Sequence, residues 1–324
     1  ETTEGWQFHT INWDAPYFLD TLFRLKSSLT FDKNTNAFFF GTTANTLDKL
    51  QTPDRGPTEG DSFGSYANYN DELRQVNSNG KTNAFYNQYE YIKPSWKFSI
   101  EYDFLGGNLR PLLGVQIQDV TINDYSGDDV TIDGDDAKQT DTLLKQRDEA
   151  GAITGFNGGW NNLARFGLAY DRRDFEPDPT TGYLLEAMAE VSREEYGSDF
   201  NYERYTASGR YFFSNWPVEI PVVFAARGVY SQLEGNPPFF EFNTMAFTTG
   251  NLDGLGGLRS LRGFKSNRFN GPIMNLYNLE LRWTMFELAG LGQRFEFMLV
   301  PFYDVGRVFN EVDDLRFVNY QQSY

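Results

Sequence analysis

The segment at residues 256–269, GGLRSLRGFKSNRF, concentrates basic side chains in a chain that is otherwise strongly acidic. It carries Arg259, Arg262, Lys265 and Arg268, whereas the chain of 324 residues has a net charge of −17. A guanidinium forms its strongest hydrogen bonds with carboxylates, in a bidentate geometry. The chemistry that this segment offers is therefore ion pairing with acidic residues elsewhere in the chain.

Motifs for catalysis or metal binding are not found in the sequence. It contains no nucleophile elbow, no P-loop and no HExxH motif, and its only histidine is His9. The acidic stretch 123–141 does not fit an EF-hand, because with Asp129 at position one, Thr131 falls at position three and Thr140 falls where a bidentate Glu belongs. We expect an exposed acidic loop there, with divalent ions shared with lipid headgroups as the alternative. The sequence thus predicts a protein that is not an enzyme and that uses no metal and no cofactor.

The composition excludes further classes of protein. No run of 18 apolar residues occurs, which excludes a transmembrane helix. The acidic balance argues against a nucleic-acid partner, because phosphate contacts need clustered Lys and Arg. The absence of cysteine fits a cell envelope without proving it. The first residues, ETTEGWQF, lack a secretory signal, so we expect a mature chain or a missing upstream part.

The dominant pattern along the chain is alternation of apolar and polar residues. In 275–285, for example, Tyr277, Leu279 and Leu281 alternate with Asn278 and Glu280. A period of two over about ten residues predicts strands with one apolar and one polar face. Such alternation occurs at 23–31, 96–104, 165–171, 204–211, 275–285 and 294–308.

Two architectures produce this pattern, a soluble β-sandwich and a membrane barrel. A barrel turns the apolar face to lipid and has strands of about nine to eleven residues, with short turns on one rim and long loops on the other. The links between the predicted strands alternate in this way, which favours a transmembrane antiparallel β-barrel of the outer-membrane type. We expect short links at 32–36, 105–108, 177–182 and 214–219, a link of intermediate length at 193–201, and long links at 45–82, 124–159 and 234–273.

The basic segment lies in the longest C-terminal loop of this barrel, residues 234–273, which we expect to be extracellular and to fold into the lumen. The two strands that follow place Glu280 and Asp304 on their polar faces. If these strands pair, both carboxylates point into the lumen, and Arg262 can lie between them. Gly263 would allow a tight turn and Phe264 would fill apolar space at the wall. The alternative is that Arg262 is an ordinary exposed loop arginine.

These motifs resemble the Omp85 superfamily of outer-membrane barrels. Its sixth extracellular loop carries [VI]-R-G-[FY], here Leu261 to Phe264, and its F-x-D-x-G strand motif is matched by Phe302, Asp304 and Gly306. The stretch 167–187 resembles the Y-D-x-R-D hairpin of the family. The resemblance implies a lumen latch in which the loop arginine engages acidic strand residues: Arg262, Gly263, Phe264, Glu280, Asp304 and Gly306.

The resemblance also implies a location and a function. The family barrel has sixteen strands, of which we expect about ten to twelve in residues 1–324, a single barrel domain that is incomplete at both ends. The leading hypothesis is an outer-membrane assembly and insertion factor, BamA-like or TamA-like, that templates client β-strands at a lateral seam. The alternatives are a polypeptide-secreting channel, a barrel that anchors a fused enzyme, and a general porin. The implied partners are outer-membrane lipids and lipopolysaccharide, client outer-membrane or secreted polypeptides, and accessory lipoprotein subunits.

One aromatic cluster is open to two interpretations. The stretch NAFYNQYEY at 83–91 has the composition of the aromatic girdle at a barrel rim, and also that of a sugar-binding platform. We expect the rim girdle.

Overall fold

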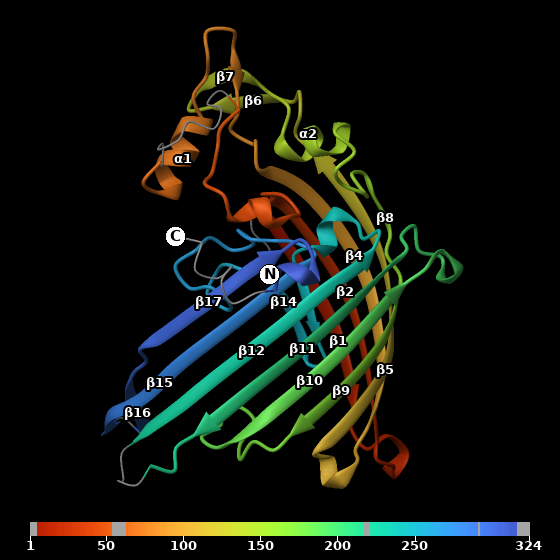
Figure 1. Ribbon diagram of the computed structural model, residues 1–324, viewed down its shortest axis with the longest axis vertical. Coiled ribbons are helices and arrows are strands. Elements are labelled where there is room, and N and C mark those ends of the chain that lie inside the picture. Colours follow the sequence, from red (N-terminus) through yellow and green to blue (C-terminus); the bar gives the residue numbers. More distant parts are fainter. Residues whose placement is uncertain (1–4, 54–62, 217–220, 291, 316–324) are drawn as a thin grey trace.

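The computed structural model describes residues 5–53, 63–216, 221–290 and 292–315. A large antiparallel sheet forms the wall of the molecule, with ten strands in a continuous order and β17 paired beside β16 on the same neighbour. Figure 1 shows this sheet curving, so that β9 to β12 and β15 to β17 form a front wall and β1, β2 and β4 lie behind it. In sheet order the strands are β1 (Trp6–Ala15), β2 (Phe23–Phe38), β4 (Gln88–Tyr102), β5 (Leu109–Asp124), β9 (Leu163–Asp171), β10 (Gly182–Ser192), β11 (Tyr202–Phe213), β12 (Val222–Gly235), β15 (Ile273–Gly290), β16 (Gln293–Leu299) and β17 (Phe302–Phe309).

The two faces of the wall have opposite character. Large apolar side chains stand exposed on the outer face, whereas the inner face carries charged and polar side chains that are buried beneath loops. This is the reverse of a soluble protein and is what a sheet turned toward lipid requires. Among the described residues, no helix is both long enough and apolar enough to cross a membrane. The exposed outer side chains include Ile11, Leu29, Trp96, Ile117, Phe166, Leu185, Leu281 and Trp283.

The connections are short on one rim and long on the other, which we call the turn rim and the loop rim. The turn rim includes 16–22, 103–108 and 172–181, and the loop rim includes 39–87, 125–162 and 236–272. The prediction of a short turn at 32–36 is wrong, because β2 continues through these residues. The asparagines there make an irregularity between Asn34 and Ala37 in the pairing of β2 with β4, and the turn lies earlier, at 16–22.

Smaller elements at the loop rim pack into a cap. Strand β3 (Lys81–Thr82) pairs with β7 (Asp135–Gln139), which pairs with β6 (Asp129–Ile132). Figure 1 shows β6, β7 and the helices α1 (Tyr66–Leu73) and α2 (Leu143–Glu149) above the wall. The short strand β8 (Gly158–Trp160) pairs antiparallel with β5 near the loop-rim end of β5.

The aromatic stretch 83–91 lies largely inside this cap, so its prediction as an exposed rim girdle is wrong. Tyr86 and Tyr89 are buried, and Tyr69 of α1 donates a hydrogen bond of 2.5 Å to Asn87. The tyrosine rings supply the apolar core that two long loops need in order to pack, while their hydroxyls find polar partners.

The last part of the wall is divided in two. The predicted continuous strand 294–308 is interrupted at Val300 and Pro301, so β16 pairs with the C-terminal half of β15 and β17 pairs with its N-terminal half. Proline fits here because it cannot donate to a β-ladder. A register shift between Thr284 and Phe286 in β15 accompanies the break.

Candidate functional site

Residues 236–272, which we call the inner loop, lie against the inner face of β12, β15 and β17. The loop contains the turn η5 (Phe239–Glu241) and the hairpin of β13 (Thr244–Phe247) and β14 (Gly250–Asp253). Figure 1 shows β14 behind the front wall. The loop and the wall share a buried apolar cluster, which holds the loop against the inner face of the wall. This cluster consists of Val229, Met274, Leu276 and Val308 from the wall and Met245, Phe247, Leu252, Leu255, Leu261 and Phe269 from the loop.

Arg262 lies between Asp304 and Glu280. Its Nε and Nη2 donate to the two oxygens of Asp304 at 2.8 and 2.6 Å, its backbone N–H donates to the same carboxylate at 3.0 Å, and its Nη1 donates to Glu280 at 2.7 Å. The guanidinium also lies over the ring of Phe302, 3.7 Å from the centroid. The hydrogen bonds to Asp304, opposed by desolvation and reinforced by Glu280, raise the pKa of Arg262 above its usual value. The side chain therefore stays charged at every accessible pH.

The strand register explains why the two carboxylates meet. Asn278 pairs with Asp304 and Glu280 pairs with Phe302, so the acids are diagonal neighbours on one face of β15 and β17. Asn278 is a site residue that sequence reasoning did not assign, although its phase placed it on the same face. Its amide donates to Asp304 at 2.7 Å and to the carbonyl of Ser260 at 2.8 Å, and so ties the loop to the strand pair.

The two glycines of the predicted latch serve different physical needs. Gly306 faces Leu261, and a Cβ built on it would lie 3.1 Å from both Leu261 methyl carbons, so its role is to leave room for the loop. Gly263 has open space around it but a φ of +99°, which a side chain would strain. Phe264 does not fill apolar space at the wall. It is 55% exposed and packs edge-to-face on Phe269 within the loop.

Two of the other basic residues of the segment, Lys265 and Arg268, contact the end of β2 and the first long loop. The Lys265 amine lies 4.0 Å from the ring centroids of both Phe38 and Tyr66. Arg268 donates hydrogen bonds to the carbonyls of Thr46 and Asp48, the latter at 2.7 Å. The cationic segment thus connects the two ends of the sheet at the loop rim, because residues 39–53 follow β2.

A second anchor of the inner loop escaped sequence reasoning. Arg204 of β11 is fully buried and donates to Glu190 of β10 at 2.6 Å and to both the carboxylate and the carbonyl of Glu241. Arg165 of β9 donates to the other oxygen of Glu190 at 2.8 Å, and Asn161 donates to Glu241 at 2.6 Å. A buried charge needs such partners. The alternation of apolar and polar residues placed Arg165 and Arg204 on the inner face of the predicted strands. Nothing in the sequence linked either arginine to a residue of the loop.

The acidic stretch 123–141 lies at the loop rim, away from the inner loop. Asp129, Asp133, Asp135 and Asp136 are exposed on the hairpin of β6 and β7, as expected of an acidic surface loop. Within the described part of the chain, no group of three or more His, Cys, Asp and Glu residues could hold a metal ion.

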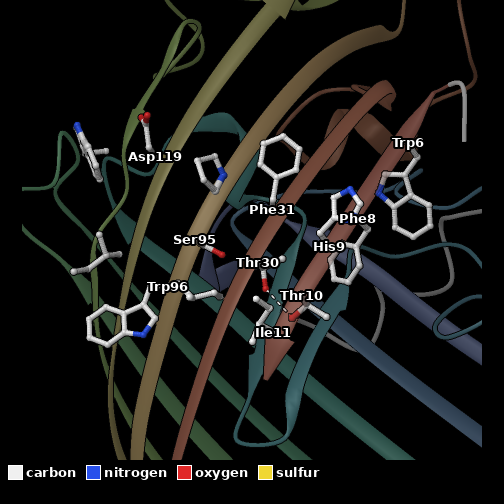
Figure 2. Close-up of a pocket in the computed structure, with 14 residues that line it drawn as sticks. Trp6, Phe8, His9, Thr10, Ile11, Thr30, Phe31, Ser95, Trp96 and Asp119 are labelled. Atoms are coloured by element: carbon white, nitrogen blue, oxygen red, sulfur yellow. Dashed lines mark hydrogen bonds between the residues drawn. The ribbon is translucent and has the colours of Figure 1, made fainter. Parts of the chain in front are cut away.

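The outer face beside β1 carries an apolar hollow. Figure 2 shows His9 and Ile11 of β1 near Phe31 of β2, with Trp96 of β4 further along the same face. Strand β1 pairs with β2, and within the described ranges no β-bridge joins it to β16 or β17. The hollow therefore lies next to a sheet edge that has a row of backbone groups available for pairing.

An antiparallel wall with an apolar outer face, a polar inner face and a long loop anchored inside defines an outer-membrane β-barrel. The model of the Omp85 superfamily domain matches residues 57–323, and the chain belongs to this family. It is accordingly a protein of the bacterial outer membrane, and the family resemblance drawn from the sequence motifs is confirmed.

Solved structures of the family share this fold. The chain is similar to BamA from Haemophilus ducreyi lacking POTRA domains 1–3, with 12% identity and a TM-score of 0.57 over 98% of this chain and 54% of that one. It is also similar to CdiB from Escherichia coli, with 11% identity and a TM-score of 0.50 over 96% and 44%. The chain spans about half the length of these proteins. Among curated proteins, none matches.

Proposed function

We propose that this barrel belongs to an outer-membrane assembly and insertion factor that templates client β-strands at a lateral seam. The observation that carries the proposal is the pair of sheet edges: β1 at one end, and β16 with β17 at the other, each paired on one side within the described residues. An edge of this kind can add a strand by main-chain hydrogen bonding. The work requires no catalytic group and no cofactor.

The hollow beside β1 supports the same proposal. A client strand that pairs with β1 would bring its outward-facing apolar side chains against Ile11 and toward the rings of Phe31 and Trp96. The proposed partners are unfolded outer-membrane polypeptides, the lipids and lipopolysaccharide around the barrel, and accessory lipoprotein subunits.

A second candidate is a channel that secretes one exported polypeptide. The charged inner face favours it, because a polar lumen suits a chain in transit. In this case the inner loop would have to move, since it occupies the lumen side of β12, β15 and β17.

A crosslinking experiment tests the leading proposal. A photoreactive amino acid is placed at Ile11 of β1 or, as the control, at Leu185 of β10, which is also exposed on the outer face. The full-length protein in vesicles is then given an unfolded outer-membrane protein. We expect adducts with the client from position 11 and not from position 185, together with faster client folding. Equal adducts from both positions would exclude templating at β1, and export without client folding would favour the channel.

A further inference from the structure

A pocket of about 390 Å³ lies on the inner face, between the inner loop, strands β11, β12 and β15, and the turn 172–181. It is lined by six arginines and two glutamates, in a chain whose net charge is −17. We call it the arginine pocket. It reaches the turn rim, because Glu176, Pro177 and Pro179 of the turn form part of its lining. The arginines are Arg173, Arg210, Arg227, Arg259, Arg262 and Arg282.

Two of these arginines directly face each other. Arg210 of β11 and Arg227 of β12 are register partners, and both point to the inner face. Like charges at directly opposed positions on neighbouring strands are destabilising. Arg210 has Glu186 at 3.5 Å, but its buried Nε has no hydrogen-bond partner.

The charges of Arg227 and Arg259 are not neutralised by a paired acid. The Arg227 guanidinium donates to the Asn278 side-chain oxygen at 2.9 and 2.7 Å and to the backbone carbonyl of Arg259, which are all neutral acceptors. Within the described part of the chain, neither Arg227 nor Arg259 forms an ion pair. The Arg259 side chain is exposed, so it is free to reorient.

The acids nearby are engaged by the other arginines. Glu280 binds Arg262 and also Arg282, the latter at 3.0 Å, and Asp304 is taken by Arg262. Outside the pocket lining, Asp171 binds Arg173 at 2.7 Å. The positive charge that remains is therefore concentrated on Arg227 and Arg259, next to Arg210, whose ion pair with Glu186 is long at 3.5 Å.

We propose that the arginine pocket binds an oxyanion, a carboxylate or phosphate group, through Arg210, Arg227 and Arg259. The guanidinium fork matches two oxygens of such a group, and an anion between the facing arginines would relieve their repulsion. Lipid headgroups are not the source, because the pocket is on the inner face. The two sources are a free phosphate ion and a carboxylate of a polypeptide that enters from the turn rim.

Calorimetric titration of the full-length protein in detergent, at constant ionic strength, tests this site. The probes are inorganic phosphate and a short glutamate-rich peptide, with its glutamine counterpart as the uncharged control. We expect phosphate to bind, and Arg259→Gln and Arg210→Gln each to weaken its binding about tenfold, the effect of losing one charge-assisted contact. Arg74→Gln, which removes the same charge from the cap, should leave the binding unchanged.

The two sources give different results in the same titrations. Tighter binding of the acidic peptide, in competition with phosphate, assigns the site to polypeptide carboxylates, whereas binding of phosphate alone assigns it to the free ion. The proposal is overturned if neither probe binds, or if binding is the same in Arg259→Gln and Arg210→Gln as in the native protein. Arg259→Gln keeps the experiment decisive, because this side chain forms no ion pair within the described residues and its loss should leave the fold intact.

Discussion

Asp304 accepts three hydrogen bonds from Arg262, one from the backbone N–H and two from the guanidinium. The backbone bond fixes the position of the inner loop on β17, and the bidentate pair fixes the direction of the side chain. The contact therefore specifies a single placement of the loop, because a shift in either direction would break several charge-assisted bonds at once.

Replacing Arg262 with Ala should loosen the inner loop while the wall still folds. The change leaves Asp304, whose side chain is 5% exposed, without its charged partner. We expect a loss of about 2–4 kcal/mol, toward the low side of the cost of breaking a fully buried pair, because the Arg262 side chain is 20% exposed. Limited proteolysis should show new cleavage at residues 250–272.

The variant Arg262→Lys separates charge from geometry. Lysine keeps the charge but cannot form the bidentate pair, so we expect intermediate protection from protease. Protection equal to the native protein in both variants would show that the apolar cluster alone holds the loop.

Gly306→Val should displace Leu261 and thereby weaken the contact of Arg262 with Asp304. The new side chain would meet the Leu261 methyl groups and the carbonyl of Asn275, which lie 3.1 and 3.2 Å from a Cβ at this position. We expect a loss of about 1–3 kcal/mol from overpacking, measured by the denaturant midpoint. Gly290→Val is the matched control, since a Cβ there has no neighbour within 4 Å.

Arg204 and Glu241 should be energetically coupled. Arg204→Met alone leaves the carboxylate of Glu241 without its charged partner, and Glu241→Gln alone removes one of the two acids that bind Arg204. In a double-mutant cycle we expect a coupling energy of about 1–3 kcal/mol. The measurement is equilibrium unfolding in vesicles. Additive effects would show that the two side chains do not depend on each other.

The turn 172–181 should be sensitive to acid through Asp174. Desolvation acts to raise the pKa of Asp174, but hydrogen bonds from the Thr180 side chain and from the backbones of Thr180 and Thr181 prevail and lower it to about 2. The folded state then binds this proton less readily than the unfolded state. The stabilisation is complete above the ordinary pKa of 3.8 and is lost as pH falls through 2.

The variant Asp174→Asn isolates this effect from that of the other acids. Because Asp174 is exposed, we expect a difference of under about 1 kcal/mol at pH 7. The difference in unfolding free energy between native protein and variant should shrink between pH 4 and pH 2. A constant difference across this range would contradict the assignment.

Much of the wall could be predicted from the sequence, because period-two alternation and link lengths are local properties. The face of Glu280 and Asp304 followed from phase alone, and the structure brings Arg262 to both. The turn expected at 32–36 was wrong because an asparagine-rich stretch can form an irregularity inside a strand as readily as a turn between strands. The role of Phe264 was wrong because its neighbour in space, Phe269, belongs to the loop itself.

The contacts that could not be predicted join residues that are distant in sequence and carry no motif. Glu241 follows two phenylalanines in a loop, and only its three-dimensional place beside Arg204 gives it a role. Likewise, the burial of Tyr86 and Tyr89 depends on the packing of one long loop against another, which composition does not reveal.

The interruption at Val300 and Pro301 divides the last strand of the wall into β16 and β17, which are held to the rest of the protein by different numbers of contacts. The β17 half is fastened by Arg262 and, just beyond its end, by Asn310, whose side chain accepts a hydrogen bond of 2.7 Å from the backbone of Ala44. Every residue of β16 is exposed, and its described pairing is to β15 alone. Loss of strand pairing at this edge should therefore begin at the turn rim, where β16 pairs with β15, and stop at Pro301. The sheet can then open at the turn rim while β17 stays paired with β15 at the loop rim.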